Sequence, residues 1–419
     1  MADVVVVGAG LAGLACARHL AAAGVEPLVV DASDAVGGRV RTDVVDGFRL
    51  DRGFQVLLTA YPEARALLDY DALDLQPFEP GAKVWLDGAL HHVGDPLRAP
   101  LSALPTLLAP IGTFADKLRI LKLRRAVTAG SLDAIRTRPE MTTEAALRER
   151  YGFSDAIIDR FFRPFLGGVL LDRGLEPSSR AFELYFRMFA RGSAAVPARG
   201  IQQIPEQLAA GLPDGTVRLQ ARAESVQPGR VTLGVGDPIE ARAVVIATDE
   251  PEAATLLRRA APPVGRTVCA VYWSAPEAPV DDPILVLDGE NDGPVNNLAV
   301  MSRVAPSYAP DGHHLVVTSV LGNPACSDAE LERRIRTQLR GWFGDAVDAW
   351  EPLRTYRILS AHPHQAPPAL TPPERPHRVG DGLFLAGDHL TNASIQGALR
   401  SGRLAAQAVL ADVGAAPAS

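Results

Sequence analysis

Cysteine is scarce in this sequence. Only three are present among 419 residues, at Cys16, Cys269 and Cys326, and no two stand in a C-x-x-C arrangement. This spacing supports neither a disulfide framework nor a zinc site. We therefore expect no bound metal, and a reducing compartment such as the cytoplasm is the simplest location.

Long apolar runs and basic blocks are missing as well. No stretch of about 18 apolar residues is present, so no membrane-spanning helix is expected. The chain begins Met1-Ala2-Asp3 without a basic segment, which argues against a signal peptide. The formal net charge is −7, which argues against nucleic acid as a partner.

The overall composition is that of a globular protein. Hydrophobic residues make up 47% of the chain and charged residues 22%. This balance suits one large domain or two ordinary domains with a sizeable core.

The first residues form an apolar run that ends in a glycine turn. Val4 to Val7 is typical of a buried parallel strand, and Gly8, Gly10 and Gly13 follow it in G-x-G-x-x-G spacing. Gly8 allows a tight turn, Gly10 lets the backbone approach a pyrophosphate, and Gly13 lets a helix pack against the strand. That helix, expected over about Leu11 to Ala23, would direct free N–H groups at phosphates.

A second strand and an acid follow in the order that a dinucleotide fold requires. Pro27 to Val30 forms the strand, and Asp31 ends it 18 residues after Gly13. An acid at this place accepts hydrogen bonds from a ribose and favours FAD or NAD over a 2′-phosphate. Gly37-Gly38-Arg39 then adds backbone donors and a guanidinium for a second side of the pyrophosphate.

A related signature lies near the C-terminus. The run 382–385 reads as a strand, Gly387 and an exposed acid, Asp388, follow it, and Ser394 to Ala398 reads as a helix start. A helix N-terminus stabilises the negative charge of a reduced flavin. Both signatures in one chain indicate a single dinucleotide held from two sides, and we expect FAD.

These motifs resemble those of the amine-oxidase, phytoene-desaturase and protoporphyrinogen-oxidase superfamily of flavoproteins. Many members carry Glu where this chain has Asp31, a shorter acid that should still reach a ribose. The resemblance extends to 48–55, similar to the segment that passes the flavin ring, and to 243–248, similar to the strand that closes the dinucleotide fold. It implies an α/β fold, with a Rossmann-like FAD-binding domain and a discontinuous α+β substrate domain.

The resemblance also implies which residues hold the cofactor. Because no cysteine follows Cys326 near the C-terminal motif, we expect the FAD to be bound without a covalent link. The predicted cofactor-binding residues are Gly8, Gly10, Leu11, Ala12, Gly13, Asp31, Ala32, Gly37, Gly38, Arg39, Gly53, Phe54, Gln55, Val56, Ala223, Ala247, Thr248, Gly387, Asp388, Ser394, Ile395, Gln396 and Ala398.

We expect each domain to come from several pieces of the chain. The FAD-binding domain would comprise 1–90, 200–265 and 376–419. A helical insert, 91–199, and a sheet, 266–375, would together form the substrate domain.

Local patterns predict the main elements of this layout. Ser327 to Glu330 is a capping box that opens a helix to about Phe343, and the last helix is expected over about Gln396 to Leu410. We expect 216–219 and 230–233 to pair as strands. The second sheet is expected to hold strands at 267–273, 284–287, 298–302, 315–321 and 353–359.

Within the superfamily, 163–172 and 197–205 look nearest to the protoporphyrinogen-oxidase-like and desaturase-like branch. The resemblance implies an oxidoreductase that takes a hydride from an apolar or amphipathic small molecule, first an isoprenoid- or tetrapyrrole-like one. The reduced flavin would pass its electrons to O2 or another acceptor. Two other classes stay open: an FAD-containing cis–trans isomerase with no net oxidation, and an NAD-dependent enzyme that would purify without yellow colour.

Amine oxidation is the runner-up within the same class. Family members that oxidise amines place a lysine beside the flavin. This chain has only Lys83, Lys117 and Lys122, and only Lys83 stands at a suitable place in the sequence.

Three side chains are catalytic candidates, each with a structural alternative. Gln55 follows the glycine of the flavin segment and either lines the pocket or bonds to backbone. Asn296, next to Asn297, either faces the pocket or belongs to a turn. His389, beside Asp388, acts either as a general base or in a structural or phosphate-side role.

Two neighbouring aromatic residues are weaker candidates. Tyr272 and Trp273 alternate on a predicted strand, so only one of them can face the flavin. We expect core packing for both.

An apolar segment, 97–108, precedes a stretch with Arg119, Lys122, Arg124 and Arg125. A basic amphipathic helix of this kind can bury its apolar face at the inner face of a membrane. The alternative, which we favour, is that the apolar residues line a tunnel or core and the basic face is solvated. Peripheral membrane contact and the oligomeric state therefore stay open.

Overall fold

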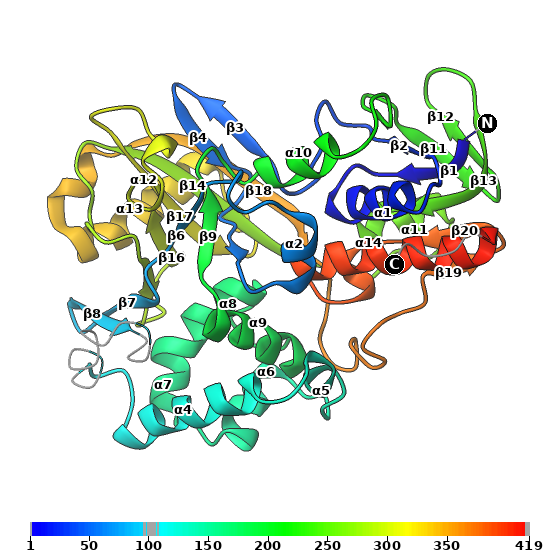
Figure 1. The fold of residues 1–419 in the computed structure, drawn as a ribbon. Helices are drawn as coiled ribbons and strands as arrows, with labels where there is room; N and C mark the ends of the chain where they lie inside the picture. The colour runs from blue at the N-terminus through cyan, green and yellow to red at the C-terminus, as the bar shows by residue number, and fades with distance from the viewer. Residues whose placement is uncertain (1, 95–97, 99–105, 107–108, 415–419) are drawn as a thin grey trace.

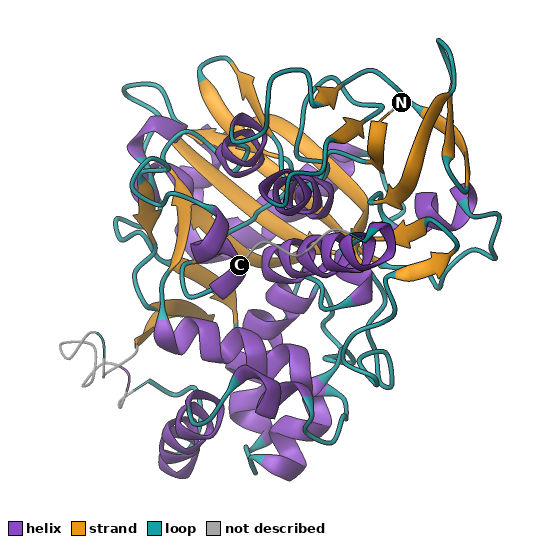
Figure 2. Cartoon of the chain, turned by 45° about the vertical axis from the view of Figure 1, so that its right-hand side comes forward, coloured by secondary structure: helices purple, strands orange, loops and turns teal. Residues whose placement is uncertain are grey.

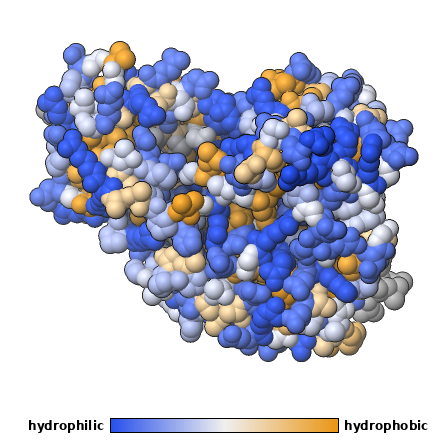
Figure 3. All heavy atoms as spheres, turned by 180° about the vertical axis from the view of Figure 1, so that it is seen from behind, coloured by the Kyte–Doolittle hydropathy of each residue, from blue (hydrophilic) through white to orange (hydrophobic). Residues whose placement is uncertain are grey.

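The computed structural model describes residues 2–94, 98, 106 and 109–414. Two large sheets lie side by side, and a group of helices lies below them (Figure 1). The first strand and the last helix of the chain belong to the same lobe, at the right of Figure 1. Seen from behind, the surface is hollowed between the two lobes (Figure 3).

The first sheet has eight strands from segments far apart in the chain. They are β1 (Ala2–Val7), β2 (Pro27–Val30), β10 (Val217–Arg218), β11 (Ala223–Gln227), β12 (Arg230–Leu233), β13 (Ile239–Ile246), β19 (Arg378–Gly380) and β20 (Leu383–Leu385). The parallel strands stand in the order β10-β2-β1-β13-β20. Strands β12–β11 and β19 extend the sheet by antiparallel pairing.

Helices cover both faces of this sheet, and the alternation of β1 explains how. Val4 and Val6 pack with the helices of one face, and Val5 and Val7 with those of the other. The central strand is therefore apolar and buried from Val4 to Val7, as its sequence predicts. The helices are α1 (Leu11–Ala22), α10 (Gln203–Ala210) and α14 (Ile395–Val413) on one face and α11 (Glu250–Leu256) on the other.

The second sheet has seven strands. They are β7 (Gly81–Leu86), β8 (Ala89–Gly94), β14 (Arg266–Ala275), β15 (Leu285–Asp288), β16 (Val295–Val300), β17 (His314–Leu321) and β18 (Glu351–His362). Their order is β18-β14-β17-β16-β15-β7-β8, antiparallel except between β15 and β7. Helix α13 (Asp328–Phe343) covers one face, where Trp273 is buried; Tyr272 is buried in the core of the opposite face.

Shorter elements complete the fold. Figure 2 shows the helices of the insert gathered beneath the sheets. These are α4 (Phe114–Thr128), α5 (Leu132–Arg136), α6 (Thr143–Ala145), α7 (Asp155–Ile157), α8 (Arg163–Leu170) and α9 (Ser179–Arg191). The remaining pieces are β3 (Thr42–Val45), β4 (Phe48–Asp51), β5 (Leu57–Leu58), α2 (Pro62–Leu67), β6 (Leu75–Pro77), β9 (Ala194–Pro197) and α12 (Met301–Val304).

Two local predictions are wrong. Strand 230–233 pairs with β11, not with 216–219; the latter region gives only β10, which joins β2 in parallel. The partner was missed because 223–227 has a single β-branched residue, Val226. Asn296 and Asn297 lie inside strand β16 and are buried, so they form no turn.

The predicted division into an FAD-binding domain and a substrate domain stays a prediction, but strand pairing favours a different boundary near residue 81. Strand β7 pairs with β15, and β8 pairs with β7, so residues 81–94 join the second sheet although the division puts 81–90 with the first. No helix among the described residues is long and apolar enough to cross a membrane.

Candidate active site

The glycine turn after β1 is closely packed on one side and open on the other. Gly8 has φ +111°, and a Cβ at Gly13 would lie 1.9 Å from the Gly8 carbonyl oxygen, so both positions require glycine. A Cβ at Gly10 would meet nothing within 4 Å. Helix α1 starts there with no side-chain cap and no acid in its first turn. This leaves its N–H groups free for an anion.

Asp31 and the glycine pair border the same turn. The Asp31 carboxylate accepts hydrogen bonds from the backbone N–H groups of Ala9 and Ser33, each at 2.7 Å. The N–H of Gly37 donates to the Ala9 carbonyl at 2.9 Å, which brings Gly38 next to Gly10. The predicted ribose acid therefore stands at the turn, in contact with its backbone.

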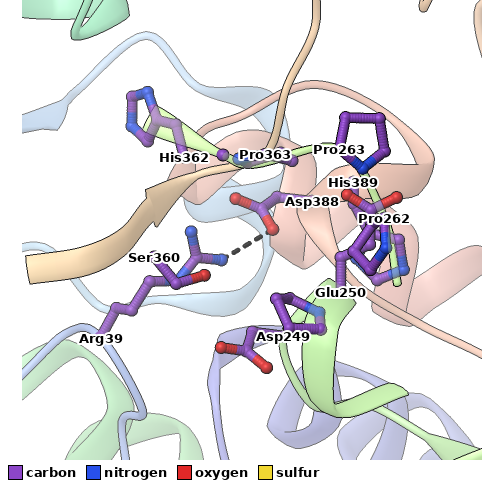
Figure 4. Close-up of a pocket in the computed structure, with 12 residues that line it drawn as sticks. Arg39, Asp249, Glu250, Pro262, Pro263, Ser360, His362, Pro363, Asp388 and His389 are labelled. Atoms are coloured by element: carbon purple, nitrogen blue, oxygen red, sulfur yellow. Dashed lines mark hydrogen bonds and ion pairs between the residues drawn. The ribbon is translucent and has the colours of Figure 1, made fainter. Parts of the chain in front are cut away.

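Arg39 and Asp388 join the two predicted signatures directly. The Arg39 guanidinium is 2.7 Å from Asp388 Oδ1 (Figure 4). It also donates to the Ala361 carbonyl at 2.6 Å. Asp388 is 6% exposed, so the prediction of an exposed acid is wrong. Burial opposes its ionisation, but Arg39 outweighs that effect and keeps the pKa of this carboxyl below its ordinary value. The pair borders a hollow of about 300 Å³ at the carboxyl ends of β13 and β20. In parallel sheets this edge is where ligands bind.

Two histidines border the same hollow. Burial lowers the pKa of His362 and of His389 to about 4, so both rings are neutral near pH 7. His389 lies against Gly387, where a Cβ would be 2.4 Å from the ring, and its Nδ1 has no hydrogen-bond partner. A neutral ring with so low a pKa is a weak proton acceptor. The structure thus places His389 beside the Arg39–Asp388 pair, and its catalytic role stays a prediction.

The start of α14 is ordered by its own side chains. Ser394 Oγ accepts from the N–H of Gly397 at 2.9 Å and from Asn392 Nδ2 at 2.6 Å. Gln396 is 1% exposed, its Oε1 accepts from the Glu63 N–H at 3.0 Å, and its Nε2 has no partner. An unpartnered buried donor at a helix start is a place for a ligand acceptor atom.

The segment Gly53 to Val56 packs on the face of the second sheet that lies opposite α13, where Phe54 and Val56 join the core around Tyr272. Gln55 Nε2 donates to the carbonyls of Arg39 at 2.9 Å and Arg52 at 3.1 Å. In this structure the Gln55 amide therefore bonds to backbone, which is the structural alternative to lining the pocket. Phe54 packs edge-on against Phe78, with ring centroids 6.1 Å apart.

A buried carboxyl anchors the strand just before this segment. Asp51 is 1% exposed and accepts hydrogen bonds from Thr42 Oγ1, the Ile201 N–H and Tyr308 Oη. Burial raises its pKa to about 6, and these hydrogen bonds limit the rise. Asp51 therefore links β4 to the chain that enters α10.

An apolar row crosses the second sheet at the level of Gly53. Val268 of β14 is paired with Ile358 of β18 and with Leu321 of β17, and all three side chains are half-buried. A Cβ at Gly53 would lie 3.3 Å from Ile358, and one at Gly167 of α8 would lie 3.5 Å from Leu321. The row therefore extends from the predicted flavin segment to the helical insert. Sequence reasoning missed it, because only the strand register puts these residues in line.

The asparagine pair ties β16 to α8. Asn296 Nδ2 donates to the Pro164 carbonyl at 2.8 Å and to Asn297 Oδ1 at 3.0 Å. Asn296 Oδ1 is buried without a partner. A Cβ at Gly168 would lie 3.1 Å from both side chains, so α8 approaches them closely. Asn296 thus lies near the apolar row and keeps one free acceptor.

A further residue that the sequence did not reveal supports the C-terminal motif. Gln365 is 5% exposed and lies in the proline-rich loop. Its Oε1 accepts from the Ala393 N–H at 2.9 Å, and its Nε2 donates to the Asp388 carbonyl at 3.4 Å. The loop gave no periodic signal that could have singled it out.

The remaining predicted residues lie around the same turn or along β11 and β13. Leu11 and Ala12 open α1, Ala32 is exposed after Asp31, Ala223 is buried on β11, Ala247 and Thr248 follow β13, and Ile395 and Ala398 lie in the first turn of α14.

Lysine and cysteine side chains lie elsewhere. Lys83 forms an ion pair with Asp282, and Lys117 and Lys122 lie on α4. Cys16 is fully buried in α1, and Cys269 faces the core under α13. Among the described residues, no three His, Cys, Asp or Glu side chains gather as a metal site.

Comparison with known proteins gives a consistent set of matches. The family model described as flavin containing amine oxidoreductase matches residues 11–410. Coproporphyrinogen III oxidase of Propionibacterium freudenreichii subsp. freudenreichii is 28% identical over 75% of this chain and 71% of its own. The 15-cis-phytoene desaturase of Narcissus pseudonarcissus is 24% identical over 98% of this chain and 80% of its own.

Solved structures share the fold. Cyclohexylamine oxidase from Brevibacterium oxydans superposes with a TM-score of 0.71 at 19% identity, covering 99% of each chain. The predicted fold class, a parallel-sheet dinucleotide domain combined with a second α+β part, is confirmed by this likeness.

Proposed function

This chain belongs to the family of flavin-containing amine oxidoreductases, and on that premise we propose that it binds FAD and oxidises an apolar or amphipathic small molecule. It is a flavin-dependent oxidoreductase, as its sequence predicts. We propose an isoprenoid- or tetrapyrrole-like substrate first, because a phytoene desaturase and a coproporphyrinogen oxidase are among its relatives. Electrons would pass from the flavin to O2 or another acceptor.

Several features fit FAD in particular. The open space beside Gly10 and the uncapped start of α1 suit a pyrophosphate, and Asp31 suits a ribose. Arg39 and Asp388 would hold the middle of the cofactor, and the unpartnered Gln396 Nε2 offers a donor at the start of α14. When bound, FAD would supply the acceptor for the hydride, which carries both electrons of the oxidation.

We propose that the cofactor is held without a covalent link. None of the three cysteines lies beside the predicted flavin segment, since Cys16 and Cys269 are buried in other cores and Cys326 follows β17 near the start of α13. His389 is packed against Gly387 rather than projecting from its loop.

The apolar row Ile358–Val268–Leu321 is the observation that carries the substrate class. It faces Gly53 of the flavin segment at one end and α8 at the other, and its side chains are half-buried. Apolar side chains that are only half-buried inside a fold suit the wall of a chamber for an apolar molecule. The chain's own contribution is to bind and orient such a substrate and to keep water away. Asn296, with its free Oδ1, borders α8 at Gly168, the residue after the Gly167 that borders Leu321.

Amine oxidation is the second candidate, favoured by the likeness to cyclohexylamine oxidase. The placement of the lysines opposes it, because Lys83 is held by Asp282 and neither other lysine lies near Gly53. The comparisons give no support to the isomerase alternative.

We further propose that α4 rests on a membrane surface. Phe114, Leu118 and Leu121 share one face by their spacing and are 65%, 54% and 47% exposed. Lys122 and Arg125 are exposed beside them. The predicted apolar segment 97–108 lies almost wholly outside the described residues.

Anaerobic titration of the purified protein tests the function. A flavin band near 450 nm should be present, and denaturation should release the flavin as FAD. We expect the band to bleach with porphyrinogens or carotenoid precursors and to persist with amines. Bleaching by amines alone would overturn the substrate class, and a colourless protein that cannot be reconstituted with FAD would overturn the proposal.

A further inference from the structure

A second hollow, distinct from the one at Arg39 and Asp388, lies where the helical insert meets α14. It holds about 360 Å³ of space, part of it open to solvent, and is bordered by α5, α9, the loop that precedes β19, and α14. In Figure 1 this loop, in orange, descends from the α14 lobe to the helices of the insert. Its charged lining residues are Arg136, Arg180, Arg400 and Glu374.

Three guanidinium groups share this hollow with one lining carboxylate. The side chains of Arg136, Arg180 and Arg400 are only 15%, 10% and 19% exposed. Arg400 binds Glu374, with its Nε and Nη2 each 2.5 Å from Glu374 Oε1. Arg136 Nη1 lies 3.7 Å from the same oxygen. Among the residues that line the hollow, three positive charges therefore face one negative charge.

Three further acids, Glu63, Glu140 and Asp133, lie outside the lining of the hollow and pair with its arginines from the rim. Glu63 is bound by Arg403 at 2.6 and 2.9 Å, and its contact with Arg400 is 3.6 Å. Glu140 accepts from the backbone and hydroxyl of the loop at Leu370 and Thr371 and is 4.0 Å from Arg180. Asp133, the other acid near Arg136, has a side chain that is 78% exposed.

Arg136 makes fewer hydrogen bonds than Arg180, and its ion pairs are longer than the shortest one of Arg400. Its Nη1 bonds to Asp133, while Nε and Nη2 bond to no described residue. Burial and the neighbouring Arg400 lower its pKa, although Glu374 and Asp133 act in the opposite sense. Arg180, by contrast, has two nitrogens on the carbonyls of Arg138 and Leu370. Free guanidinium nitrogens under like-charge repulsion are a receptor for an anion.

We propose that this hollow binds a compact oxyanion, the phosphate or carboxylate group of a small molecule. Arg136 would take two of its oxygens, since the guanidinium fork matches planar and tetrahedral oxyanions. Arg400 and the Asn392 amide border the same space. Because Asn392 also bonds to the cap of α14, an anion here would steady the start of that helix. The site does not depend on the flavin reaction.

Thermal unfolding of the holoprotein tests the site, with inorganic phosphate and succinate as probes and chloride to keep ionic strength constant. We expect 10 mM of at least one probe to raise the Tm by about 2 °C or more. A response to phosphate alone, to succinate alone or to both identifies the oxyanion. No response to either probe would overturn the proposal.

Substitution separates binding from structure. Arg136→Gln removes a single hydrogen bond, to the exposed Asp133, and relieves the repulsion from Arg400, so it should change the Tm without probe little and abolish the response. Arg230→Gln, at an exposed ion pair with Glu240, should keep the full response. An equal response in R136Q and the unmodified protein would refute the site. The flavin spectrum and dithionite reduction of R136Q should be unchanged, which separates this test from that of the oxidoreductase.

Discussion

Neighbouring glycines in the first turn have different physical roles, and single substitutions should separate them. Gly10→Ala places a methyl group in open space, so the apoprotein should keep its stability within about 1 kcal/mol. The same methyl group would occupy the place proposed for the pyrophosphate, so FAD affinity should fall at least about tenfold. Thermal unfolding of the apoprotein and fluorescence titration with FAD measure the two effects.

Gly13→Ala is the matched comparison. Its Cβ would overlap the Gly8 carbonyl oxygen at 1.9 Å, so the apoprotein itself should lose about 1–3 kcal/mol or more. If both variants bind FAD as the unmodified protein does, the turn does not hold the pyrophosphate.

Asp51 should make stability fall as pH rises. Its pKa is about 6 in the folded protein and near its ordinary value, about 3.8, when unfolded. The folded state therefore holds this proton more tightly than the unfolded state does. As a result, the free energy of unfolding falls between about pH 4 and about pH 6, and the contribution of Asp51 is constant at higher pH. The effect is at most about 2–3 kcal/mol. Asp51→Asn keeps an oxygen acceptor for Thr42 and Ile201 and removes this titration.

Urea unfolding at pH 5 and pH 8 measures the difference. The decrease in unfolding free energy between the two should be smaller in D51N than in the unmodified protein. Asp214→Asn, at an exposed turn, should leave the decrease unchanged. A D51N profile parallel to that of the unmodified protein would show that Asp51 is charged at both pH values.

At the scale of elements, the crossing of α1 and α14 connects the two halves of the cofactor site. A Cβ at Gly402 would lie 2.3 Å from the Ala12 carbonyl oxygen and 2.8 Å from Ala15 Cβ. Gly402→Ala should therefore push the helices apart, cost about 1–3 kcal/mol and weaken FAD binding, because both helices start at the proposed FAD site. Chemical denaturation and FAD titration test this.

Gly341→Ala on α13 is the control, because it makes the same glycine-to-alanine change within another helix. Gly341 also lies within a helix, but its Cβ would meet nothing within 4 Å. Alanine should there stabilise the helix by about 0.5–1 kcal/mol and leave FAD binding unchanged. Equal effects of the two substitutions would mean that the crossing is not tight.

Elements with a strong local signal could be predicted from the sequence, and those fixed by distant partners could not. The strand at Pro27–Val30, the helix after Gly10 and the helix opened by Ser327 agree with prediction within about two residues. Ser327 caps its helix, but Glu330 bonds to Arg333 and Arg334 instead of completing the capping box. Strand β11 was missed because its pairing, not its composition, makes it a strand.

The candidate site shows the same limit. Glycine spacing and the acid at Asp31 predicted where the turn lies, since both are local requirements of the backbone. The row Ile358–Val268–Leu321 depends on the register of three strands, which no local pattern encodes. Gln365 likewise acts only because its loop returns to the C-terminal motif.

For the whole molecule, the distribution of charge decides how it could meet a membrane. The net charge of −7 repels an anionic surface, but that repulsion is screened beyond about 8 Å at physiological salt. Close to the surface, each exposed cation contributes about 1 kcal/mol and each buried apolar side chain about 1.5–3 kcal/mol. Helix α4 offers both kinds of contact, since Phe114, Leu118 and Leu121 form its apolar face and the exposed Lys122 and Arg125 lie beside them.

Cosedimentation with phosphatidylglycerol–phosphatidylcholine vesicles tests this orientation. Binding should be weak, reversible and reduced by 0.5 M NaCl, and Leu118→Ser together with Leu121→Ser should reduce it at least about tenfold. Val264→Ser, which removes an apolar side chain that is 84% exposed in a loop outside α4, should leave it unchanged. Equal loss in the two variants would mean that general surface hydrophobicity, not α4, governs the contact. No binding of the unmodified protein at low salt would show that the apolar face of α4 meets something other than an anionic lipid surface.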